Sequence, residues 1–257
     1  VELTGDGQRV VFSTAQDDDS TIVGELWSVR IDGTSLVQLN PGPAFWPGDF
    51  RLAPDGSRVL YRQSSELVSA RVDGAGFRIL TSGASQSGGF LISDDSVFCV
   101  FASTEGGQWS LRLDRLDGTQ PFELLAPMPT PITPLELVDG STSAVLLIGG
   151  KLYSLATPNA LVLIGGDAVY TGHVLGFPIV LQTPDGRELL YRDDTGAGVL
   201  ELFAGRLDGS APPRKLSLPL AGERDVQSFR LAVDGRVLYH ADQFVNDQFA
   251  LYGVPLD

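Results

Sequence analysis

The sequence has very few of the side chains that most often carry metal or redox chemistry. Of its 257 residues only one is a cysteine, Cys99, and two are histidines, His173 and His240. A single cysteine cannot form a disulfide within the chain, and Cys99 lies in an apolar run where a small core residue is expected. No His-x-x-x-His or Cys-x-x-Cys pattern occurs. We therefore predict no cofactor and no catalytic residue, and we interpret His240, just after a strand, as a hydrogen-bonded side chain at a sheet edge.

Basic residues are also scarce. The chain has 18 Lys and Arg against 32 Asp and Glu, a formal net charge of −14 at pH 7. An acidic surface repels phosphate backbones and anionic lipid headgroups. Nucleic acid and membrane surfaces are therefore not expected partners.

Helical and membrane-spanning patterns are missing as well. No segment keeps a helical period, and no apolar run has the length of a membrane-spanning helix. The 30 glycines and 16 prolines instead fall at turn spacing between short apolar runs. We expect an all-β chain that does not insert into a membrane.

What the sequence does contain is a repeated phrase: Asp-Gly, a short apolar run, and a second Asp-Gly. Its first half is clearest in Gly5 to Phe12, Pro54 to Tyr61 and Pro184 to Tyr191, and three weaker copies bring the total to six. The turn positions lie 40 to 49 residues apart, at Gly7, Gly56, Ser96, Gly140, Gly186 and Gly235. Asp-Gly between apolar runs is a strong hairpin signal, so each unit is predicted to be a chain of hairpins with four short strands.

The apolar runs after the first turns do not alternate with polar residues, which indicates sheets covered on both faces. Sheets stacked face to face in a repeat of this period are typical of a β-propeller. We predict one all-β domain, a six-bladed propeller with four-stranded antiparallel blades and a last blade of three or four strands. The predicted blades are residues 1–40, 47–81, 88–126, 133–164, 176–217 and 226–257.

The repeat resembles that of TolB-like propellers. The likeness lies in the phrase Pro54 to Tyr61, in the Glu-Leu that precedes three of the second turns, and in the closing Leu80-Thr81. Residues 133–164 depart most, with Pro158-Asn159 in place of Asp-Gly. The resemblance implies a propeller fold, and its members include periplasmic scaffold proteins, gating domains of oligopeptidases and some polysaccharide lyases.

The resemblance also implies an exported bacterial protein. The chain starts at Val1 and stops at Asp257, where the repeat leads us to expect a glycine and a further strand. We expect a processed or excised piece of a periplasmic or extracellular protein, with its signal segment outside this sequence.

Three groups of residues are candidate sites. Asp17, Asp18 and Asp19 offer clustered oxygens that suit Ca²⁺, with a solvated acidic loop as the alternative. Phe45 and Trp46, in a Pro- and Gly-rich loop, form either an aromatic platform for a ligand or a plug between blades. The third group consists of polar residues in first strands, predicted to share one register facing the central channel: Glu2, Arg51, Glu136, Gln182 and Arg230.

Two hypotheses of function remain open, with a third on the extent of the chain. The first is a non-enzymatic, monomeric propeller that holds a protein or peptide. The second is a sugar-binding or carbohydrate-active propeller, which requires Glu2 and Glu136 to face each other rather than to pair with Arg51 and Arg230. The third is that the propeller is an accessory domain of a larger polypeptide.

Overall fold

The computed structural model describes residues 1–18, 21–40, 44–45, 50–63, 65–81, 89–138, 143–157, 160–165, 180–194, 198–220, 224–242, 244–245 and 247–256. For residues 15–18, 21–23, 44–45 and 156–157 only the backbone is described. The chain divides into two compact units, Val1–Thr142 and Ser143–Asp257, which are treated separately below. Over the described ranges no helix is long and apolar enough to cross a membrane.

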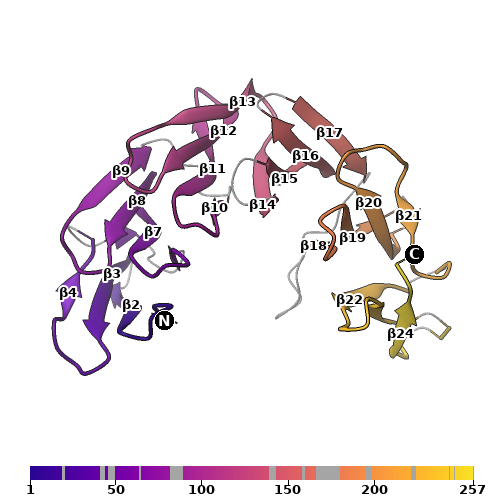
Figure 1. The fold of residues 1–257 in the computed structure, drawn as a ribbon, viewed down its shortest axis with the longest axis horizontal. Coiled ribbons are helices and arrows are strands. Elements are labelled where there is room, and N and C mark those ends of the chain that lie inside the picture. The colour runs from indigo at the N-terminus through magenta and orange to yellow at the C-terminus, as the bar shows by residue number, and fades with distance from the viewer. Residues whose placement is uncertain are drawn as a thin grey trace. The chain divides into compact units, whose positions relative to one another are not determined.

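The strands form six antiparallel sheets in chain order (Figure 1). The first contains β1 (Glu2–Leu3), β2 (Arg9–Asp18), β3 (Thr21–Arg30) and β4 (Val37–Gln38), with β5 (Ala44–Phe45) also pairing β3. The second contains β6 (Phe50–Leu52), β7 (Arg58–Gln63), β8 (Glu66–Arg71) and β9 (Phe77–Thr81). The third contains β10 (Phe90–Ile92), β11 (Phe98–Glu105), β12 (Gln108–Arg115) and β13 (Phe122–Met128).

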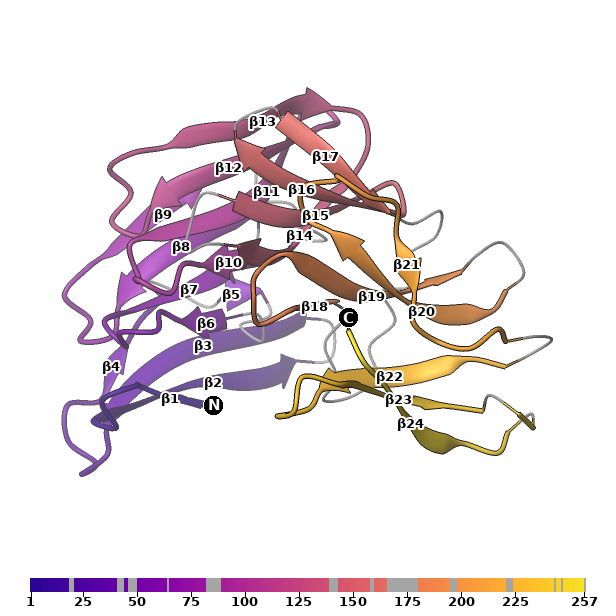
Figure 2. The same cartoon turned by 45° about the vertical axis from the view of Figure 1, so that its right-hand side comes forward.

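The remaining sheets continue the same order. The fourth contains β14 (Ile132–Val138), β15 (Ser143–Ile148), β16 (Lys151–Thr157) and β17 (Ala160–Gly165). The fifth contains β18 (Val180–Gln182), β19 (Glu188–Asp194), β20 (Leu200–Arg206) and β21 (Arg214–Lys215). The sixth contains β22 (Val226–Leu231), β23 (Val237–Ala241) and β24 (Ala250–Val254) (Figure 2).

These sheets confirm the predicted fold class, a six-bladed all-β propeller whose last blade has three strands. The irregular fourth repeat forms a four-stranded sheet like its neighbours despite its altered turn sequence. The proposed single domain and its blade limits stay a prediction.

In the five repeats whose first turn the structure describes, the turn is held by its aspartate. Gly56 adopts a φ of 69°, in the left-handed region that glycine tolerates best. The Asp55 carboxylate accepts a hydrogen bond from the Ser57 N–H at 2.9 Å, and Asp185 accepts one from Arg187 N–H at 3.1 Å. Ser96 takes the glycine position in the third sheet at a φ of 60°. The Asp-Gly sequence therefore indicates a turn that is stabilised by a hydrogen bond to its own aspartate side chain.

In the first, second, third and fifth repeats the second turn also has an arginine two residues before the aspartate. Arg71 Nη2 lies 2.7 Å from Asp73 Oδ2, and Arg206 pairs with Asp208 in the same way at 2.8 Å. The hydrogen bonds from Arg71 and from the Ala75 N–H lower the pKa of Asp73 from 3.8 to about 2. The ionised carboxylate is thus favoured by the folded turn.

This turn predicts a specific acid dependence. Because the folded pKa of Asp73 is depressed, its contribution to stability is present above pH 3.8 and is lost as the pH falls toward 2. We expect the stability difference between the parent and Asp73→Asn to shrink over that interval. Both partners are solvent-exposed, so the difference at pH 7 should stay below about 1 kcal/mol. Urea unfolding between pH 7 and pH 2.5 measures it, and a constant difference over that range would contradict the assignment.

Successive sheets pack through apolar faces. We call the face that a sheet turns toward the next sheet in chain order its forward face. Leu60 and Leu67 on the forward face of the second sheet share a buried cluster with Phe90 of β10. In the other unit, Leu190 and Leu202 of the fifth sheet share a cluster with residues of the sixth. Cys99 is buried in the first of these clusters, as predicted, and burial raises the pKa of its thiol.

Polar side chains also bridge neighbouring sheets. Tyr61 Oη donates a hydrogen bond to the Leu39 carbonyl at 3.1 Å, joining the second sheet to the end of the first. Arg192 Nη1 donates to the carbonyls of Val226 and Gln227 at 3.2 and 2.7 Å. These contacts give backbone carbonyls of a neighbouring sheet a hydrogen-bond partner.

Candidate functional site

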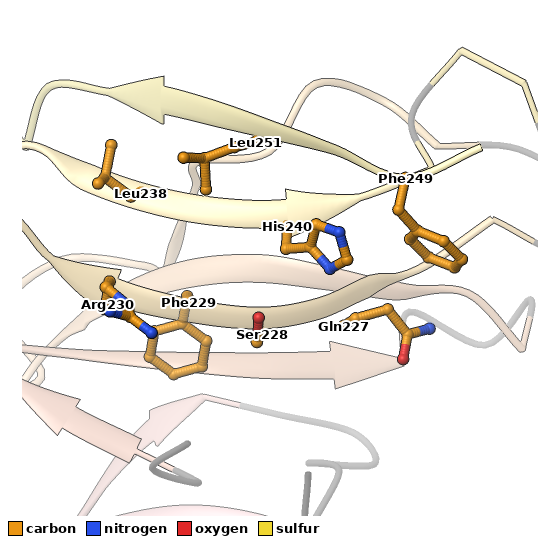
Figure 3. A pocket seen from close by; sticks show the side chains of 8 residues that line it. All are labelled: Gln227, Ser228, Phe229, Arg230, Leu238, His240, Phe249 and Leu251. Atoms are coloured by element: carbon orange, nitrogen blue, oxygen red, sulfur yellow. The ribbon is translucent and has the colours of Figure 1, made fainter. Parts of the chain in front are cut away.

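A pocket of about 680 Å³ opens on the sixth sheet, on the face that carries Arg230, Leu238 and His240 (Figure 3). Strands β22, β23 and β24 and the segment before β24 line it, through Gln227, Ser228, Phe229, Arg230, Leu238, His240, Phe249 and Leu251. Its size is within the range of small-molecule and side-chain binding pockets.

Strand register brings these side chains together. Arg230 pairs with Leu238, and Ser228 pairs with His240 across β22 and β23. His240 in turn pairs with Leu251 across β23 and β24. Directly paired residues project from the same face of an antiparallel sheet, so the two rows form one continuous surface.

The pocket combines apolar and cationic chemistry. The His240 and Phe249 rings have centroids 5.1 Å apart at an interplanar angle of 32°. Arg230 brings a permanent positive charge, whereas no Asp or Glu is among the lining residues. The site is suited to a ligand that presents an apolar group beside a hydrogen-bond acceptor or carboxylate.

The exposure of Leu251 is unusual for its place in the repeat. In four other sheets the third strand has a leucine opposite the same second-strand position, and these leucines are 0–1% exposed: Leu26, Leu67, Leu111 and Leu202. Leu251 is 67% exposed and Phe249 beside it is 42% exposed. Within its own unit, the sixth sheet therefore leaves exposed an apolar position that four other sheets bury.

The predicted channel residues do not form one set. Glu2, Arg51 and Arg230 occupy the same register, opposite Val11, Leu60 and Leu238. Gln182 pairs with Leu189 instead, one residue out of that register, because Leu181 takes the position opposite Leu190. The predicted common register is thus wrong for Gln182, which lies on the other face of its sheet.

The two predicted carboxylates have different surroundings. Glu2 Oε2 accepts a hydrogen bond from the Leu52 N–H at 2.9 Å, so this carboxylate links the first sheet to the second. Glu136 is half-buried, and its Oε2 has no hydrogen-bond partner among the described residues. Burial raises the pKa of Glu136, which favours the neutral acid. The bond to Leu52 shows that Glu2 contributes to the contact between the first two sheets, and its predicted binding role stays a prediction.

The predicted acidic loop is partly strand. Asp17 and Asp18 belong to β2 and pair with Ile22 and Thr21, so the hairpin is longer than expected. The β-branched residues that open β3 explain the extension, because they favour strand. Asp19 lies outside the described residues, and the calcium hypothesis stays a prediction. Among the described side chains no group of three or more His, Cys, Asp and Glu could hold a metal ion.

The structure describes only part of the predicted aromatic loop. Phe45 has its backbone in β5, paired with Val23 of β3, and Trp46 lies outside the described residues, as does His173. His240 was expected just after a strand, but it lies within β23, because the ladder with β24 continues to Ala241. It is exposed on the pocket surface.

Sequence reasoning identified only Arg230 as a binding residue in this pocket. It missed Phe249, Leu251, Leu238, Gln227 and Ser228. Leu251 matches the core leucines of the other repeats, so its sequence alone indicates burial.

No family model matches the sequence, and no curated protein matches it. Several solved structures are similar to this chain. Dipeptidyl peptidase 4 of Porphyromonas gingivalis is 13% identical, with a TM-score of 0.71 over 99% of this chain and 44% of that one. An oligogalacturonate lyase in complex with manganese is 11% identical, with a TM-score of 0.57 over 96% of this chain and 74% of that one. TolB from Acinetobacter baumannii is 11% identical, with a TM-score of 0.48 over 98% of this chain and 64% of that one.

At these identities the likeness concerns the fold alone. The class of protein is a six-bladed β-propeller. The chain spans less than half the length of the dipeptidyl peptidase that it matches.

Proposed function

We propose that the chain is a non-enzymatic propeller of the TolB-like type that binds a protein or peptide partner in the bacterial cell envelope. The observation that carries the proposal is the pocket on the sixth sheet, where exposed Phe249 and Leu251 lie beside Arg230. Aromatic and arginine side chains are the residues that most often dominate the energy of protein interfaces. The rigid sheet beneath them supplies a pre-organised surface, which lowers the entropic cost of binding.

The location and assembly belong to the same proposal. The repeat sequence resembles exported TolB-like proteins, and we propose a periplasmic or extracellular protein that acts as a monomer. Its net charge of −14 supports selectivity against nucleic acid and anionic surfaces. The positive charge of Arg230 within this acidic protein favours a partner with an acidic group at the contact.

Partner capture tests the proposal. The parent chain and an Arg230→Glu, Phe249→Ala double variant are immobilised and exposed to bacterial envelope extract, and the retained proteins are quantified by mass spectrometry. We expect the parent to retain a defined partner and the pocket variant to retain at least about tenfold less, as befits hot-spot substitutions.

The matched control makes the same two chemical changes elsewhere. Arg78 and Phe77 are exposed neighbours in β9, so Arg78→Glu, Phe77→Ala alters charge and aromatic content equally. This control should retain the partner at the parent level. Equal recovery by the parent and the pocket variant would remove the pocket from consideration.

A second candidate is that the propeller is an accessory domain of a larger polypeptide. The match to the dipeptidyl peptidase favours it, because 99% of this chain aligns with only 44% of that one. Intact-mass measurement of the natural gene product tests it. A product of about 27 kDa, the mass of this chain, would contradict this candidate.

A further inference from the structure

Three arginines lie together at one corner of the second sheet. Arg58 of β7 pairs directly with Arg71 of β8, and Arg78 of β9 pairs with Ser69, two residues before Arg71. Directly paired residues, and residues two apart on one strand, project from the same face of a sheet. Arg58 Nη1 donates a hydrogen bond to Ser69 Oγ at 3.0 Å, so its guanidinium lies beside the row that contains Arg78. We call Arg58, Arg71 and Arg78 the arginine corner.

The positive charge of the corner is accessible and only partly neutralised. Arg71 and Arg78 are exposed and Arg58 is partly exposed. Asp73 pairs with Arg71 at 2.7 Å. Among the residues that the structure describes, no carboxylate forms an ion pair with Arg58 or Arg78. Burial lowers the pKa of Arg58, and the nearby charge of Arg71 lowers it further, as expected where cations gather.

The second turn of the third sheet borders the corner. A Cβ built on Gly118 would lie 3.6 Å from the Arg78 Cβ. The neighbouring Asp117 carboxylate lies 3.6 Å from Arg115 Nε, in the same turn. Its charge raises the pKa of Arg58, an effect smaller than that of burial. The aspartates of the two adjoining turns are thus each paired with an arginine of their own turn, and positive charge stays in excess at the corner.

The fifth sheet shows how the chain itself fills the same corner. The equivalents of Arg58, Arg71 and Arg78, by strand register, are Glu188, Arg206 and Arg214. Glu188 Oε2 lies 3.4 Å from Arg214 Nη2. The hydrogen bond to Asp208 raises the pKa of Arg206, and the charge of Glu188 raises it further. A carboxylate therefore interacts with both arginines at the position where the second sheet has a third arginine.

The first and third sheets do not gather three arginines. In the first sheet Val37 takes the position of Arg78. In the third sheet Phe98 and Phe122 take the positions of Arg58 and Arg78. Arginine, glutamate and phenylalanine therefore all fit the position of Arg58, so the packing of the repeat does not require the arginine corner.

We propose that the arginine corner binds the carboxylates of an acidic segment of another polypeptide. A carboxylate of that segment takes the place that the Glu188 carboxylate holds in the fifth sheet. Guanidinium groups donate in pairs to carboxylates, and clustered arginines are a recurrent means of binding acidic segments. The chain's own occupant is a glutamate side chain, which argues for a polypeptide ligand.

The inference goes beyond the proposed function. The corner belongs to the compact unit Val1–Thr142, whereas the pocket of the sixth sheet belongs to Ser143–Asp257. The acidic ligand of the corner is therefore treated as separate from the partner of the pocket.

An acidic peptide provides the test. The probe is fluorescein-labelled hexaglutamate, the matched peptide is hexaglutamine with the same label, and binding to the full chain is followed by anisotropy at physiological ionic strength. Charges more than about 8 Å apart are then largely screened, so the net charge of −14 has little weight against contacts at the corner. We expect hexaglutamine to bind at least about tenfold more weakly than hexaglutamate.

A substitution that copies the fifth sheet locates the contact. Arg58→Glu should weaken hexaglutamate binding at least about tenfold, because the new carboxylate occupies the remaining arginines. The matched control is Arg9→Glu, the same change at the same repeat position of the first sheet, where Val37 replaces the third arginine. Both arginines donate to a buried serine hydroxyl, Ser69 or Ser28, so the cost to folding is matched. Arg9→Glu should bind as the parent does.

Two further variants keep the test independent of folding at position 58. Arg78→Gln removes an exposed charge and should weaken hexaglutamate binding at least about threefold. Glu188→Arg, added to Arg58→Glu, places three arginines in the fifth sheet and restores the net charge of the parent. This double variant should recover the affinity of the parent to within about threefold.

The binding measurements can overturn the inference in three ways. The first is equal binding of hexaglutamate to the parent and Arg58→Glu, and the second is an equal loss in Arg9→Glu. The third is displacement of hexaglutamate by inorganic phosphate at a lower concentration than by glutarate, which would make the corner a phosphate site.

The outcomes also separate this inference from the proposed function. If envelope capture depends on Arg230 and Phe249 while the parent does not bind hexaglutamate, the proposed function stands and this inference fails. If hexaglutamate binding depends on Arg58 while envelope capture is unchanged in the pocket variant, this inference stands and the proposed function fails.

Discussion

Replacing Gly165 by alanine should destabilise the protein by about 3 kcal/mol, because a Cβ at this position has no room. An added Cβ would overlap the Tyr191 hydroxyl and would lie 2.7 Å from Pro213 Cγ. Tyr191 is fully buried and stacks on Phe203, with ring centroids 6.0 Å apart, so the ring cannot swing away. Packed interiors transmit such overlaps into side-chain and backbone strain.

The overlap with the Tyr191 hydroxyl predicts that a second substitution, at Tyr191, restores part of the stability lost in Gly165→Ala. The Tyr191 hydroxyl has no hydrogen-bond partner among the described residues, and burial raises its pKa. Tyr191→Phe alone should therefore be neutral or slightly stabilising, since it removes a buried group without a partner. In combination with Gly165→Ala it should recover at least about 1 kcal/mol of the loss, as contacting residues do in double-mutant cycles.

Urea unfolding of the four proteins measures the cycle. Gly89→Ala is the matched control, because the nearest atom to its added Cβ is the Pro134 carbonyl oxygen at 3.4 Å, an ordinary contact distance. That control should change stability by less than about 1 kcal/mol. Strictly additive effects of Gly165→Ala and Tyr191→Phe would contradict the packing described here.

The second large effect is expected at two equivalent leucines that differ in burial. Leu202→Ala should cost about 2–5 kcal/mol, because this side chain is fully buried between the fifth and sixth sheets and its removal leaves a cavity. Leu251→Ala should change stability by less than about 0.5 kcal/mol, since most of the side chain is already in solvent.

Thermal and urea unfolding of both variants test this contrast. Each substitution removes the same atoms at the same place in the repeat, so each serves as the control for the other. A large loss for Leu251→Ala would contradict this contrast, because it would show that the Leu251 side chain is covered in the isolated protein.

Local features of the structure were predictable because local sequence causes them. The turn at Pro54 to Tyr61 follows from an aspartate that accepts the N–H two residues on and a glycine at positive φ. The burial of Cys99 follows from an apolar run with no alternation. Both effects act within a few residues, so the sequence is sufficient to identify them.

The candidate site was predictable only in part. Arg230 was identified from its place in a first strand, but Phe249 and Leu251 were not, because their types normally indicate core. Gln182 was assigned to the wrong face, since a shift of one residue in a strand reverses every side chain. Strand pairing, which the sequence does not display, decides such shifts.

By itself the sequence determined the number of sheets, the position of their turns and the all-β class, because hairpin hydrogen bonds and apolar runs are local properties. Only the tertiary structure distinguished buried from exposed residues of the same type at equivalent positions of the repeat. Leu202 and Leu251 occupy the same repeat position, yet Leu202 is fully buried in a cluster with residues of the sixth sheet, whereas Leu251 is largely exposed within its own unit. Burial depends on neighbours that lie far away in the sequence, and the exposed surface of the sixth sheet is the consequence.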